Sequence, residues 1–124
     1  MKLGQIAGKE FQDTLEDLMK QKMPIKVAYK LKGEIDKIKQ ELVKYASLHH
    51  DLLIKYGRKD KDGKLEMDKL KNVKFNEEQL ALFVAELKEL NSIEIEVKSI
   101  SVDDLGDKID LSIDDLIMLD GLIV

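Results

Sequence analysis

The chain has 124 residues, no Cys and no Trp, and its 25 acidic against 21 basic residues give a formal net charge of −4. This length predicts a single domain over residues 1–124, and the absence of Cys excludes disulfides, thiolate zinc sites and thiol catalysis. The N-terminal residues lack the apolar core of a signal peptide, and no segment approaches the roughly 18 apolar residues of a membrane span. We therefore expect a protein of the cytoplasm with no membrane contact.

The charge is divided unevenly along the chain. Residues 1–74 carry 18 Lys and Arg against 12 Asp and Glu, whereas residues 75–124 carry 3 against 13. Such asymmetry can steer a partner or help the two parts of the chain to dock on each other.

Two helices are predicted near the N-terminus, joined at a proline. The first covers residues 9–22, where apolar side chains share one face: Phe11, Leu15, Leu18 and Met19. Pro24 interrupts this helix. Because proline is well tolerated in the first turn of a helix, the same residue can begin a long second helix over residues 24–56, which stops before Gly57. The two helices together predict a helical hairpin.

An apolar seam follows the second helix at alternating steps of three and four residues, which is typical of a coiled coil or a helical hairpin. Its members are Ala28, Leu31, Ile35, Ile38, Leu42, Tyr45, His49, Leu52 and Tyr56. The helix would be roughly 50 Å long, whereas a compact domain of this size is about 35 to 40 Å across. We expect it to overhang the domain or to break at Gly33, and an overhanging end from Tyr45 to Tyr56 would need a cover.

The remaining elements are shorter. Residues 57–75 are predicted to form a charged loop with possible short strands, and Asn76 is placed to cap a third helix over residues 76–91. Residues 93–124 are predicted to hold strands and short helices. Strict alternation over residues 93–98 indicates one strand, and Ile109 with Leu111 indicates a second. Ser101 and Ser112 each precede an acidic pair, as helix N-caps do.

These elements define the expected fold class, which is α+β and mainly helical. It comprises an N-terminal helical hairpin with one long helix, a third helix, a small antiparallel sheet and a short C-terminal helix.

Two patterns that resemble metal sites fail on spacing. If Gly63 took the sixth position of a calcium loop, Arg58 and Lys69 would stand where the first and twelfth ligands should be carboxylates. His49 and His50 are adjacent on a helix, so their side chains point about 100° apart and cannot chelate one ion. We expect no metal and no cofactor.

Catalysis and nucleic-acid binding are not favoured either. The acidic pairs Asp103-Asp104 and Asp114-Asp115 occupy equivalent helix-start positions, which already explain them, and no phosphate loop or nucleophile motif is present. The lysines of the long helix lie on several faces among acidic residues, without aromatic side chains for base stacking. We predict no catalytic residue and no nucleic-acid partner.

Binding of another protein is the function class that remains. The seam is either the internal core, covered by the first and third helices, or a surface for self-association, in which Glu34 would face Lys39 of a second copy. The overhanging end and the acidic C-terminal part are the predicted partner-binding regions, represented by Tyr45, His49, Leu52, Tyr56, Asp103, Asp104, Asp114 and Asp115.

The order of several short segments resembles a family of small uncharacterised proteins encoded by tailed phages and prophages of Gram-positive bacteria. The segments are residues 21–31, residues 53–57 with 59–64, residues 104–106 and residues 116–122. The resemblance implies a phage origin and brings no catalytic residue. We therefore expect a non-enzymatic factor that inhibits or redirects a host protein by occlusion. The alternative is a virion-assembly or tail-associated component that acts as a homo-oligomer.

Overall fold

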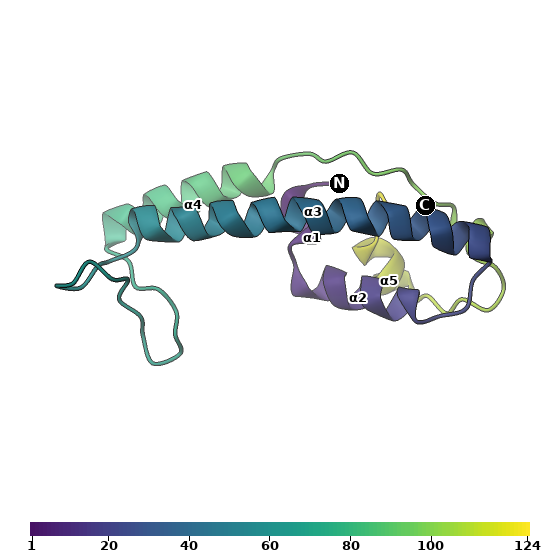
Figure 1. Cartoon of the computed structure of the whole chain (residues 1–124), viewed down its shortest axis with the longest axis horizontal. Helices are drawn as coiled ribbons and strands as arrows, with labels where there is room; N and C mark the ends of the chain where they lie inside the picture. The colour runs from purple at the N-terminus through teal and green to yellow at the C-terminus, as the bar shows by residue number, and fades with distance from the viewer.

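One long helix, α3 (Ile25–Tyr56), runs through the molecule in the computed structural model, which describes all residues 1–124 (Figure 1). It continues unbroken through Gly33, so the long helix overhangs instead of breaking. Pro24 precedes its first turn in extended conformation, as the sequence predicts for a proline at a helix start. Gly57 ends the helix, and a Cβ at this position would lie 2.6 Å from the Leu53 carbonyl oxygen, so only glycine fits.

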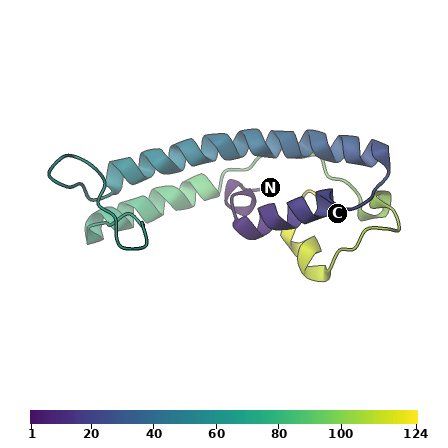
Figure 2. The same cartoon turned by 60° about the horizontal axis from the view of Figure 1, so that its bottom comes forward.

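The other helices form a second layer along α3, in two groups (Figure 2). α4 (Glu77–Asn91) runs antiparallel to the C-terminal half of α3, and α2 (Lys9–Met19) lies along the N-terminal half. Three short elements complete the chain: α1 (Leu3–Ile6), the 3-10 helix η1 (Val102–Leu105) and α5 (Ile113–Met118).

The main core lies beneath the N-terminal half of α3. It is a cluster of 14 buried apolar side chains from α1, α2, α3, the last turn of α4 and the C-terminal segments: Leu3, Ile6, Phe11, Leu15, Leu18, Leu31, Ile35, Ile38, Leu90, Ile100, Leu105, Leu119, Leu122 and Ile123. The apolar C-terminal tail thus packs inside this core, where residues 100–102 and 122–124 exchange backbone hydrogen bonds of 2.7 to 3.0 Å.

The predicted small antiparallel sheet is wrong, because the structure contains only isolated β-bridges. Exposure to solvent does alternate within residues 93–98, since Ile95 and Val97 are half-buried and their neighbours are exposed. The segment packs as an extended strap along α3. Its backbone is fixed by Met1 and Leu3, and by the buried carboxylate of Glu34, which accepts the Lys98 N–H at 3.1 Å. The buried side of residues 93–98 therefore packs against α3, where the alternating sequence pattern predicted a neighbouring strand.

Other boundaries also differ from the sequence prediction. Residues 20–22 lie outside α2, because the Gln21 side chain instead exchanges two hydrogen bonds with the backbone of Asp110, at 2.6 and 2.9 Å. The possible strands within residues 57–75 are reduced to single bridges, and α1 was not predicted. Asn76 precedes α4 as expected, but its side chain makes no capping hydrogen bond.

Candidate functional site

The end of the predicted seam is covered by the chain itself. The Tyr45 hydroxyl donates a 2.7 Å hydrogen bond to Oδ1 of Asn91, the last residue of α4. The His49 ring stacks on Tyr45 and meets the edge of Phe83 of α4, each at a centroid distance of 6.0 Å. Burial raises the pKa of the Tyr45 hydroxyl. We call the paired helices, residues 45–56 and 77–91, the arm.

An ion pair joins the two helices of the arm near its free end. Lys55 Nζ lies 3.4 Å from Glu86 Oε1 and 5.0 Å from the centre of the Tyr56 ring. A hydrogen bond with Tyr56, followed by the contacts with Glu86, raises the pKa of Lys55. The second carboxylate oxygen, Glu86 Oε2, is shielded from solvent and has no hydrogen-bond partner.

An open groove of about 570 Å³ runs between the two helices on this side of the arm. We call it the arm groove. Its apolar side chains are Leu48, Leu52, Leu90 and Ile93, and its charged side chains are Asp51, Lys55, Glu86 and Glu89. Leu48 and Ile93 are 47% and 48% exposed, so the groove leaves part of its apolar lining open to solvent. Of the four predicted seam residues, only Leu52 lines this groove; Tyr45, His49 and Tyr56 are half-buried outside it.

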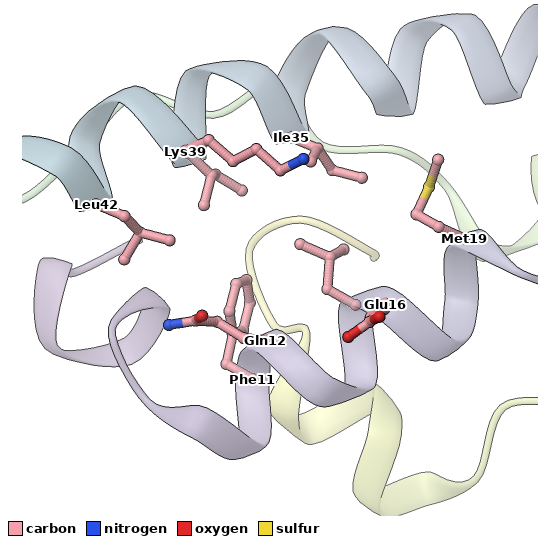
Figure 3. Close-up of a pocket in the computed structure, with 9 residues that line it drawn as sticks. Phe11, Gln12, Glu16, Met19, Ile35, Lys39 and Leu42 are labelled. Carbon is pink, nitrogen blue, oxygen red and sulfur yellow. The ribbon is translucent and has the colours of Figure 1, made fainter.

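A second groove, of about 330 Å³, separates α2 from α3 over the main core (Figure 3). Ile35 and Leu42 of α3 face Phe11 of α2 across it, and the polar groups at its edge are those of Gln12, Glu16 and Lys39. Its floor consists of core side chains that are already packed, so this groove has fewer free apolar groups than the arm groove.

The predicted acidic residues lie far from the arm, in the segments that hold η1 and α5. Asp115 takes part in a capping box with Ser112. The Asp115 carboxylate accepts the Ser112 N–H at 3.0 Å, and the Ser112 hydroxyl oxygen accepts the Asp115 N–H at 3.0 Å. Asp103, Asp104 and Asp114 are exposed and belong to no ion pair. The structure therefore does not bring these aspartates together with the four seam residues.

No group of three or more potential ligands that could hold a metal ion is present. The loop that resembles part of a calcium site uses its Asp60 carboxylate differently, to accept the N–H groups of Asp62 and Lys64 at 2.8 and 3.0 Å. None of the helices combines the length and the apolar character needed to cross a membrane. No protein-family model, no curated protein and no solved structure matches this chain.

Sequence reasoning missed the arm groove because it followed a single seam. Leu48, Leu52 and Lys55 are spaced at i, i+4 and i+7, so they form a second stripe beside the seam on the same helix. That stripe was visible in the sequence. The α4 residues opposite it were not, because their position depends on the register between the two helices.

Proposed function

We propose that this chain is a non-enzymatic, phage-encoded protein that binds an amphipathic helix of a host protein in the arm groove and so occludes it. The observation that carries the proposal is the groove itself, which is open and lined by four apolar and four charged side chains. This is the surface that recognises helices in many peptide-binding proteins, where apolar side chains at i, i+3 or i+4, and i+7 enter a groove between two helices.

The geometry of the arm favours a helix as the ligand. α3 and α4 are antiparallel neighbours, and a third helix laid along their shared groove would complete a three-helix bundle. Leu48 and Ile93, each about half exposed, would then become buried. Burial of apolar surface is the main favourable term in such an association.

The charge of the groove indicates which helix would bind. Asp51, Glu86 and Glu89 stand against a single cation, Lys55, which is already paired with Glu86. The expected ligand is therefore an amphipathic helix whose apolar face is flanked by Lys or Arg, because cationic side chains would reduce the excess negative charge of the groove.

The phage origin, the action on a host protein and the cytoplasmic location rest on the sequence features described above, and they belong to the same proposal. Occlusion requires no chemistry from this chain, since a bound helix is simply withheld from its ordinary partner.

Two single substitutions on α3 test the proposal. Leu48→Glu places a charge in the arm groove, whereas Val43→Glu places the same charge on a side chain that is 71% exposed and does not line the groove. Tagged wild-type protein and both variants would be used to capture partners from host lysate, followed by mass spectrometry. The captured protein's helix would then be synthesised for affinity measurements.

We expect wild type and Val43→Glu to bind the same helix, and Leu48→Glu to bind it at least about tenfold more weakly, because a buried unpaired charge opposes association. Equal thermal unfolding of the two variants would show that the fold is intact. If Leu48→Glu bound as tightly as Val43→Glu, the arm groove would not be the binding site.

A further inference from the structure

The loop between α3 and α4 folds into two consecutive turns built on the same plan. In the first, Asp60 Oδ1 accepts the N–H groups two and four residues later at 2.8 and 3.0 Å. In the second, Asp68 Oδ1 does the same at 2.8 and 3.0 Å. Each Asp N–H also donates to the carbonyl four residues later, at 2.8 and 2.9 Å. The two turns project from the end of the arm, and we call residues 57–76 the fork (Figures 1 and 2).

The fork presents free positive charge. Between residues 57 and 75 there are seven Lys and Arg against four Asp and Glu. Two of the acids, Asp60 and Asp68, are occupied by their own turns, and Glu66 pairs with Arg58 at 3.2 Å. The lysines on the two turns belong to no ion pair; they are Lys61, Lys64, Lys69 and Lys71.

The second turn also carries an apolar side chain that nothing in the chain covers. Leu70 is 82% exposed and stands between Lys69 and Lys71. Lys71 adopts a left-handed backbone with φ of 62°, the conformation for which the first turn uses Gly63, with φ of 77°. A side chain is costly at such a position, and strain of this kind concentrates at functional sites.

A surface of opposite character lies on the half of the molecule that holds the N-terminal part of α3, away from the fork (Figure 1). Residues 101–120 contain seven Asp against one Lys, and no Asp among them is in an ion pair. Two isoleucines one helical turn apart on α5, Ile113 and Ile117, are 78% and 67% exposed beside these acids. We call this surface, residues 101–120, the acidic face.

We propose that the fork of one copy of this chain docks on the acidic face of a second copy. The two surfaces match in kind, since each combines unpaired charge of one sign with exposed aliphatic side chains. Leu70 would pack against Ile113 and Ile117, while Lys69 and Lys71 would meet the surrounding aspartates.

The fork cannot reach the acidic face of its own chain. α3 separates the two ends as a rigid helix of 32 residues, about 48 Å long. Gly106, within the acidic face, lies against Pro24 at the start of α3, whereas the fork follows the end of α3.

A contact between unlike surfaces is heterologous, so successive copies would form an open row or a closed ring. This association goes beyond the proposed helix binding and does not use the arm groove.

Cysteine pairing tests the contact directly, because the natural chain contains no Cys. Full-length Leu70→Cys protein would be mixed with Ile117→Cys protein and, separately, with Val43→Cys protein, under mild oxidation. Val43 is exposed but lies on neither surface. We expect the Leu70→Cys and Ile117→Cys pair to cross-link at least about tenfold faster than the control pair, since only the former is held in contact. Equal rates would overturn the proposal.

Charge reversal provides an independent measurement by sedimentation at low and high salt. We expect wild type to associate reversibly, more weakly at high salt, and both Lys69→Glu/Lys71→Glu and Asp104→Lys/Asp114→Lys to associate about tenfold more weakly. A mixture of the two double variants should associate again, because each then meets a surface of opposite charge. A monomeric wild type, or no recovery in the mixture, would contradict the proposal. The same holds if the fork bound anionic vesicles or single-stranded DNA while the chain stayed monomeric.

Discussion

Glu34 is the one charged side chain buried in this protein, with 6% of its surface exposed. Its Oε2 accepts the Lys98 N–H at 3.1 Å and its Oε1 lies 3.2 Å from Lys37 Nζ. The carboxylate therefore joins α3 to the extended strap that replaces the predicted sheet. We predict that Glu34→Ala destabilises the fold through this strap, whereas Lys37→Ala does not.

The expected size follows from the three contributions that change. Loss of a hydrogen bond to a charged acceptor, which also leaves a peptide N–H unsatisfied, costs about 1.5 to 3 kcal/mol. The ion pair with Lys37 contributes about 0.3 to 0.5 kcal/mol, because the lysine is mostly exposed. About 0.4 kcal/mol of this loss is offset because alanine has a higher helix propensity than glutamate. The net loss should be about 2 kcal/mol for Glu34→Ala and about 1 kcal/mol for Glu34→Gln, whose amide oxygen can still accept the Lys98 N–H.

Urea unfolding would measure these free energies, and hydrogen exchange would locate the effect. In Glu34→Ala the Lys98 amide should lose its protection from hydrogen exchange. Amides in the middle of α3 should lose only the protection that corresponds to the lower free energy of global unfolding. Lys37→Ala should lie within about 0.5 kcal/mol of wild type. The reasoning would be refuted if Lys37→Ala cost as much as Glu34→Ala, or if Lys98 stayed protected when the carboxylate was removed.

Two further predictions concern Tyr45 and the main core. Because burial raises the pKa of Tyr45 above its ordinary value of 10.0, its stabilising effect is complete below pH 10 and is lost as the pH rises through the raised pKa. Ultraviolet titration should show a tyrosine phase above the ordinary value that is absent from Tyr45→Phe, and a late phase that persisted in this variant would exclude the assignment. Phe11→Ala, at a fully buried position, should cost about 3 to 5 kcal/mol in urea unfolding. A loss near zero, as expected for the exposed control Tyr29→Ala, would contradict the core assignment.

Local chemistry made the helices predictable. Pro24 and Gly57 act on the backbone of their immediate neighbours, so the predicted limits of 24–56 lie within one residue of the observed Ile25–Tyr56. Ser112 likewise forms the capping box that its spacing to Asp115 allows. The sheet was predicted wrongly because alternation reports only that one side of a segment is buried. Whether a strand or a helix buries it depends on contacts such as Glu34 to Lys98, which join residues 64 positions apart.

The candidate sites were predictable only in part, for a similar reason. The seam identified Leu52, which lines the arm groove, and the aspartate pairs identified part of the acidic face. The sequence did not show that α4 covers Tyr45 and His49, because that cover depends on the register of two helices. The fork was assigned as an ordinary loop. Its repeated turns emerge only when the hydrogen bonds of Asp60 and Asp68 are compared.

The uneven distribution of the core connects the arm to its proposed ligand. Of the 14 residues in the core cluster, only Leu90 belongs to the arm, and Tyr45, Leu52 and Leu87 pack against the cluster while partly buried. The arm is also held by the contacts of Phe83 with His49 and Phe75, by the Tyr45 to Asn91 bond and by the Lys55 to Glu86 pair. Regions with few buried apolar contacts open more readily than the rest of a protein. A helix bound in the arm groove would add apolar burial at Leu48 and Ile93, which are about half exposed. Since a ligand stabilises the state that it binds, helix binding should stabilise the arm selectively, and with it the base from which the fork projects.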